Sequence, residues 1–186
     1  MSPSSVVRIA RDQAQLLVVD IQQKLLPLIH DHDAVIRAAE TMIRAAQMLA
    51  VPATLTEQYP QGLGPTHPKV LAAFGKHPPL QKMTFSVCGD HGCLTKLNEI
   101  NRPQVLIVGI EAHVCVLQTA LDLLRFGMQP VVLADAVSSR REFDRAIAFD
   151  RLRMAGVVVT TVESAIFELL HESGTDLFKK LLALVK

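Results

Sequence analysis

Cysteine is scarce in this chain, and it contains no long hydrophobic run. The three cysteines, Cys88, Cys93 and Cys115, are an odd number in a chain long enough to build a core without disulfides, so we expect free thiols in a reducing compartment. No stretch approaches the roughly 18 apolar residues of a membrane span. The segment Met1–Gln13 also has no apolar run of signal-peptide length. These absences argue against secretion and membrane insertion, and they predict a cytoplasmic protein.

An excess of charge of one sign is also missing. The formal net charge is +1, and no block of like charge is longer than a pair such as Lys179-Lys180. The sequence therefore predicts neither a nucleic-acid groove nor a contact with anionic membranes. No G-x-G-x-x-G motif follows a predicted strand and no G-x-x-x-x-G-K-[ST] motif occurs, so the phosphate cradles of dinucleotide-binding and P-loop proteins are absent. We expect a small-molecule partner and no cofactor.

The sequence does contain an alternation of short apolar runs and amphipathic segments. Hydrophobic residues make up 49% of the 186 residues and charged residues 20%, which fits one α/β domain over residues 1–186 with a buried parallel sheet. Strands are predicted at 16–19, 53–56, 80–84, 105–108, 130–134 and 157–161, and helices at about 31–50, 66–74, 92–100, 113–126, 141–155, 163–170 and 176–185. The Gly- and Pro-rich stretch 57–65 is predicted to be a loop, with Asp31 and Asp33 as helix N-caps.

Three polar residues lie where predicted strands give way to helices. Asp20 closes the first apolar run, Lys82 lies at the end of the third strand, and Cys115 follows the fourth strand in the first turn of a helix. The carboxyl ends of parallel strands share one edge of the sheet, so an acid, a cation and a thiol could meet there and activate a nucleophile. Each residue also has a structural interpretation: Asp20 as a cap or ion-pair partner, Lys82 as a solvated side chain, and Cys115 as an inert buried thiol.

Other candidates carry weaker signals. Cys88, His91 and Cys93 form C-x-x-H-x-C, which offers only three local ligands and does not predict a zinc site. His113 lies two residues before Cys115, so on a helix it points to a different side and is expected to be a pocket wall or a surface residue rather than a base. Asp135 is expected to cap the loop through 138–139.

Taken together, three ordered motifs resemble the isochorismatase-like cysteine hydrolase superfamily. They are LVVDIQ at 17–22, KMTFS at 82–86 and VGIEAHVCVLQTA at 108–120, and the resemblance extends from about Leu16 to about Thr161. It implies a three-layer α/β/α fold with a six-stranded parallel sheet of order 3-2-1-4-5-6. It also implies homo-oligomers, a catalytic triad of Asp20, Lys82 and Cys115, and a cis peptide bond between Ile110 and Glu111 that contributes to an oxyanion hole with the N–H of Cys115.

The activity implied is hydrolysis of a small amide or related C–N bond through a thioester on Cys115, with residues around Gln22, Tyr59, Phe85 and His113 shaping the pocket. Metal-dependent members carry an Asp-x-His pair after the second strand, where this chain has Thr-Glu-Gln-Tyr-Pro at 56–60. A set such as Glu57 with His67 would be a poor metal site, so we predict no metal. Two alternatives remain open: a vinyl ether hydrolase of the isochorismatase type that uses Asp20 as the acid, or a non-catalytic homo-oligomeric scaffold. The substrate is not predicted.

Overall fold

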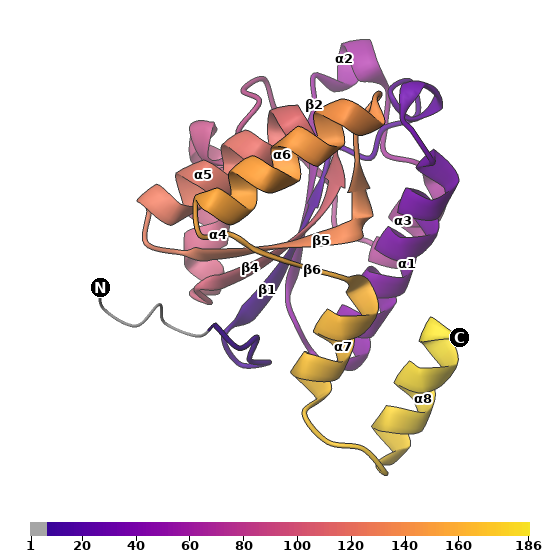
Figure 1. Cartoon of the computed structure of the whole chain (residues 1–186). Helices are drawn as coiled ribbons and strands as arrows, with labels where there is room; N and C mark the ends of the chain where they lie inside the picture. The colour runs from indigo at the N-terminus through magenta and orange to yellow at the C-terminus, as the bar shows by residue number, and fades with distance from the viewer. Residues whose placement is uncertain (1–6) are drawn as a thin grey trace.

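Six parallel strands form the centre of the molecule (Figure 1). The computed structural model describes residues 7–186, so the first six residues of the predicted 1–186 domain, which also begin the segment Met1–Gln13, lie outside the described part. The strand order β3-β2-β1-β4-β5-β6 confirms the predicted sheet. The strands are β1 (Ala14–Val19), β2 (Ala53–Gln58), β3 (Leu80–Lys82), β4 (Gln104–Ile110), β5 (Gln129–Ser138) and β6 (Val158–Thr160).

Helices cover both faces of the sheet, as Figure 1 shows. One face packs against α1 (His32–Met48), α3 (Pro68–Phe74), α7 (Val162–Leu170) and α8 (Asp176–Val185). The other packs against α4 (His91–Ile100), α5 (Leu117–Arg125) and α6 (Glu142–Met154). Short turns complete the chain: α2 (Pro60–Leu63), the 3-10 turns Leu26–Leu28 and Val87–Gly89, and the π-helical turn Ala112–Val116. No helix among residues 7–186 is long and apolar enough to cross a membrane.

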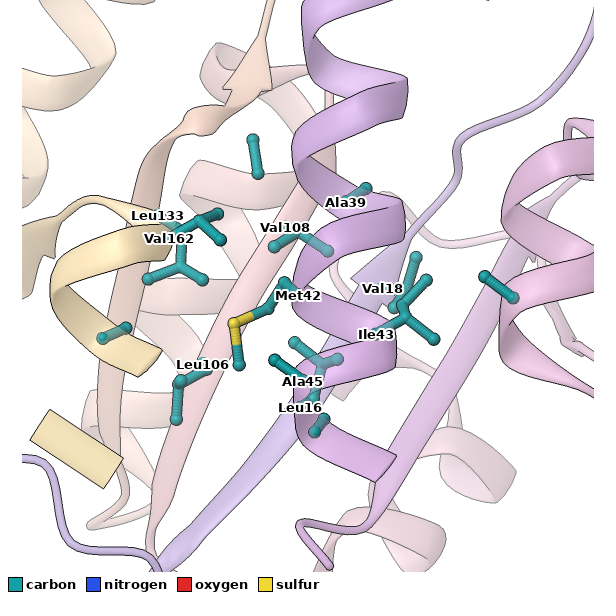
Figure 2. Close-up of a cluster of buried hydrophobic side chains, with 14 of the residues drawn as sticks. Leu16, Val18, Ala39, Met42, Ile43, Ala45, Leu106, Val108, Leu133 and Val162 are labelled. Atoms are coloured by element: carbon teal, nitrogen blue, oxygen red, sulfur yellow. The ribbon is translucent and has the colours of Figure 1, made fainter. Parts of the chain in front are cut away.

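The central strands β1 and β4 each contribute to two hydrophobic cores because successive side chains point to opposite faces. Leu16 and Val18 join the core beneath α1, whereas Leu17 and Val19 join the core beneath α4 and α5. Figure 2 shows the first of these cores, with Met42 of α1 among side chains of the sheet and of α7. Burial on both faces explains why these strands are uninterrupted apolar runs in the sequence.

Several boundaries differ from the prediction for physical reasons. β2 continues through Gln58, and α2 follows it, where a loop was predicted over 57–65. The polar residues at its end are buried and hydrogen-bonded, so they extend the strand. β5 likewise runs to Ser138. Asp31 precedes α1 in the left-handed region with no side-chain cap, so the predicted capping is wrong.

The central strands β1 and β4 bring the candidate site together. β1 pairs with β2 at one edge and with β4 at the other. The strand order therefore reverses between β1 and β4. Gly109 at the end of β4 has φ +129°, and a Cβ there would lie 2.0 Å from the carbonyl oxygen of Val19. Glycine is required at this position because the two backbones approach closely just before Asp20 and Cys115.

Candidate active site

Asp20 lies directly after β1 and is fully buried. Its backbone is left-handed (φ 54°), a conformation that aspartate tolerates better than most residues. Its carboxylate oxygens have different donors: Oδ1 accepts from the Thr56 hydroxyl at 2.8 Å, and Oδ2 accepts from the Lys82 ammonium at 2.6 Å. A buried carboxylate needs this degree of pairing to remain in a folded core.

Lys82, the last residue of β3, is only 2% exposed. Besides Asp20, its Nζ contacts Gln58 Oε1 at 2.8 Å and the backbone carbonyls of Thr84 and Phe85 at 3.2 and 3.1 Å. Lys82 is therefore not the solvated side chain that its residue type alone would suggest. Its ammonium is held in place by four oxygen acceptors.

Cys115 lies beside this ion pair, in the π-helical turn Ala112–Val116 that precedes α5. The helix predicted at 113–126 is therefore divided into a π-helical turn and a regular α-helix. Burial and the negative charge of Asp20 raise the pKa of the Cys115 thiol to about 12, and the charge of Lys82 opposes them. The hydrogen bond to Asp20 and the charge of Glu111 raise this pKa further. At neutral pH the sulfur is a thiol with a carboxylate next to it.

The turn that carries Cys115 is held by the loop after β5. The peptide bond between Ile110 and Glu111 is cis, at the position implied by the resemblance. The Glu111 side chain is buried, and its Oε2 accepts from both the backbone N–H and the Nε of Arg140, at 3.1 and 3.0 Å. His113 Nδ1 lies 2.9 Å from the hydroxyl oxygen of Ser139. Two neighbouring residues of one loop, Ser139 and Arg140, therefore contact His113 in the turn and Glu111 just before it.

The four residues predicted to shape the pocket separate into two kinds. Gln22 is fully buried, and its amide bonds the backbone N–H and carbonyl of Gln58 and the carbonyl of Gly64. Its contacts support a role in holding the chain after β2 rather than in touching a substrate. Tyr59 and Phe85 are 46% and 55% exposed, and His113 is half-buried.

Two residues of the network were not foreseen in the sequence. Thr56 and Gln58 are two apart on β2, so their side chains share one face of the strand and reach Asp20 and Lys82 respectively. The signal was available in the alternation Thr54, Thr56, Gln58, but it was hidden by ending the predicted strand at residue 56. Arg140 was also missed, because nothing in its local sequence points to Glu111.

The other candidate residues have structural partners. Glu57 Oε1 accepts from the backbone N–H and hydroxyl of Thr66, at 2.7 and 2.8 Å. Asp135 stays inside β5 and accepts from the N–H of Val162, so the predicted cap of its own loop is wrong. Burial raises the pKa of the Cys88 thiol to about 12. In residues 7–186, no group of three or more His, Cys, Asp or Glu side chains is arranged to hold a metal ion.

Comparisons with known proteins agree with this architecture. The isochorismatase domain model matches residues 14–164. The mouse protein named isochorismatase domain-containing protein 2A is 39% identical over 184 residues, which cover 98% of this chain and 87% of the mouse protein.

Two solved structures are similar over most of the chain. The MAR1 ribonuclease from Caenorhabditis elegans is 38% identical, with a TM-score of 0.90 and coverage of 96% of this chain and 92% of that one. The YcaC gene product from Escherichia coli, described as an octameric hydrolase of unknown specificity, is 25% identical with a TM-score of 0.86, covering 96% of this chain and 87% of that one.

Proposed function

Because the chain belongs to the isochorismatase domain family, we propose that it is a cysteine-dependent hydrolase of small-molecule amides or related C–N bonds. The observation that carries this proposal is the buried ion pair of Asp20 and Lys82 beside the thiol of Cys115. A buried ion pair is weak evidence for stability, whereas an acid, a cation and a thiol in contact suit nucleophilic catalysis.

In the first half of the proposed reaction, Asp20 takes the Sγ proton as the sulfur attacks the carbonyl carbon of the substrate. The C–N bond then breaks, and Asp20 returns the proton to the leaving nitrogen, which departs as an amine and leaves a thioester on Cys115. A thiol with a pKa of about 12 requires such a base, because almost none of it is thiolate at neutral pH.

In the second half, Asp20 takes a proton from water as the water oxygen attacks the thioester carbon. The C–S bond breaks, the carboxylic acid product forms, and the proton passes to the sulfur. We propose that Lys82 keeps Asp20 oriented through both halves, and that the N–H of Cys115 with the Ile110–Glu111 segment forms the oxyanion hole. Tyr59, Phe85 and His113 are proposed as pocket residues.

The test is incubation of the full-length protein with a panel of small primary and secondary amides, followed by intact-mass and peptide mass spectrometry. We expect an acyl adduct on Cys115 and loss of turnover in Cys115→Ala. Turnover of an amide by Cys115→Ala would overturn the covalent step. Release of pyruvate from isochorismate by the wild type, with no adduct, would favour the vinyl ether reaction.

Two further arms address the remaining alternatives. An RNA oligonucleotide belongs in the panel because the C. elegans relative is named a ribonuclease. The near-neutral net charge favours a small molecule over RNA. A Cys115 thiol inert to every substrate and to alkylation would favour the scaffold. We also propose self-association and a cytoplasmic location. Sedimentation velocity tests the former, with a monomer as the contrary result, and subcellular fractionation tests the latter.

A further inference from the structure

A cleft of about 550 Å³ lies at the edge of the sheet, beside the first half of β2. It exists because β3 is short: β3 pairs with β2 only from Thr56 and Leu80 onward. In the described chain, the outer edge of 53–55 therefore has no strand beside it. α4 and the 74–80 segment, which joins α3 to β3, line the opening instead. Its volume falls in the range of small-molecule sites.

One residue that lines the cleft has a buried hydroxyl with no partner. Thr54 lines the cleft and is only 4% exposed, and its hydroxyl oxygen makes no hydrogen bond within the described residues. Buried hydroxyls are rarely left in this state, because loss of hydration without a replacement bond costs about 1 to 3 kcal/mol. The remaining walls are mostly apolar, with Phe74, Leu80 and Ile100 among them. An apolar site with one unpartnered hydroxyl fits an apolar molecule that carries a polar group.

The charged side chain that lines this cleft is the Lys96 ammonium. His77 also lines it, and a second cavity that shares Ala53, Phe74 and His77 with it adds the ammonium of Lys76. Lys96 pairs with Glu99 at 3.5 Å, but both side chains are exposed, so this pair has little energetic weight. Anionic ligands are therefore favoured over neutral or cationic ones.

We propose that this cleft is a second small-molecule site that binds a carboxylate with an apolar body, such as an arylalkanoate. The apolar body lies against Phe74, Leu80 and Ile100, the carboxylate faces Lys96 and His77, and the Thr54 hydroxyl gains a hydrogen-bond partner. Thr54 lies at the start of β2, whereas Thr56 and Gln58, which bond Asp20 and Lys82, lie toward the other end of that strand. Binding here therefore does not depend on the function proposed for Cys115.

The test is isothermal titration calorimetry of the full-length protein with 4-phenylbutyrate, using 4-phenylbutan-1-ol as the matched neutral probe. A ligand of this size is expected to bind with a Kd of about 1 mM or tighter. Thr54→Val should weaken 4-phenylbutyrate binding about fivefold by removing one hydrogen bond. Lys96→Met should weaken it about threefold, and Ile100→Trp should abolish it by filling the cleft. Lys180→Met on α8 removes the same charge elsewhere on the surface and should leave binding unchanged.

Three results would overturn the proposal: no binding of 4-phenylbutyrate up to its solubility limit, equal affinity for the alcohol, or equal weakening by Lys96→Met and Lys180→Met. Thr54→Val replaces an unpartnered hydroxyl with a methyl group, so it should remain folded and keep the test interpretable. A crystal soaked with the acid gives an independent reading. Ligand density in the cleft lined by Thr54 and Ile100 would support the proposed site, and ligand density only elsewhere would overturn it.

Discussion

Replacing Asp20 by Asn should make Cys115 more reactive toward alkylating agents while it stops hydrolysis. The Asp20 charge is the largest cause after burial of the raised thiol pKa, and its hydrogen bond adds to the effect. The substitution removes the charge, replaces the charged acceptor by a neutral amide, and leaves the opposing charge of Lys82 in place. The ammonium keeps three oxygen acceptors, from Gln58 and two backbone carbonyls, so Lys82 remains hydrogen-bonded.

The magnitude follows from the proximity of the charges. A charge within about 4 to 6 Å shifts a pKa by about 1 to 3 pH units. A fall of about 2 raises the thiolate fraction about 100-fold wherever the pH lies below the pKa. Thiolates of lower pKa are weaker nucleophiles, with a Brønsted coefficient of about 0.4 to 0.5, which cancels about tenfold of the gain. Cys115 in Asp20→Asn should therefore react about ten times faster than in the wild type.

The assay is iodoacetamide labelling between pH 6 and 9, followed by peptide mass spectrometry. In the wild type the rate should climb about tenfold per pH unit, because a pKa of about 12 lies above the whole range and thiolate forms only as pH rises. Cys88 is an internal control, since its pKa is also raised to about 12, but by burial and the charge of Asp122. Its rate should be the same in both proteins.

Labelling of Cys115 in Asp20→Asn at the wild-type rate or slower, with Cys88 unchanged, would refute this electrostatic account. The variant also leaves a buried ammonium without its counterion, which lowers stability. The double variant Asp20→Asn/Lys82→Met leaves no buried charge unpaired. Its labelling rate can therefore be measured even if the single variant does not fold. It should label faster than the wild type and more slowly than the single variant, because the charge of Asp20 outweighs that of Lys82.

Three substitutions test the contacts that hold the site together, with the free energy of unfolding measured by urea denaturation. Lys82→Met should lower the free energy of unfolding by about 3 to 5 kcal/mol, because it leaves the carboxylate of Asp20 buried without its cation; a loss below 1 kcal/mol is the contrary result. Thr56→Val removes a hydrogen bond to that carboxylate and should cost about 1.5 to 3 kcal/mol, so a neutral effect contradicts the contact. Gly109→Ala should cost more than about 4 kcal/mol. Gly156→Ala, also at positive φ but in open space, should cost about 1 to 2, and equal losses would refute the steric argument.

The strands were predictable wherever burial alone determines the sequence. β1 and β4 are buried on both faces, so they are apolar runs that can be recognised without knowledge of their neighbours. The end of β2 was not predictable in this way. Glu57 and Gln58 are polar because they bond Thr66 and Lys82, and those partners come from later parts of the chain.

The same reason limits prediction of the site. Asp20, Lys82 and Cys115 could be named because each lies at or after the end of a strand, and parallel topology brings strand ends to one edge of the sheet. The contact between Arg140 and Glu111 depends on how the loop after β5 folds back, which no local pattern records. Gln22 was predicted to shape the pocket, whereas its amide is hydrogen-bonded to backbone groups.

The pairing of β1 with β2 aligns Val19 with Thr56 and so decides which side chains of β2 face the ion pair. Sliding β2 by a single position would turn Thr56 and Gln58 toward the opposite layer and present Leu55 and Glu57 in their place. Asp20 would then meet an apolar side chain where it now meets a hydroxyl donor, and Lys82 would meet a second carboxylate in place of its amide acceptor. The set of side chains around Asp20 and Lys82 thus depends on the backbone register between β1 and β2 as much as on which residues the sequence contains.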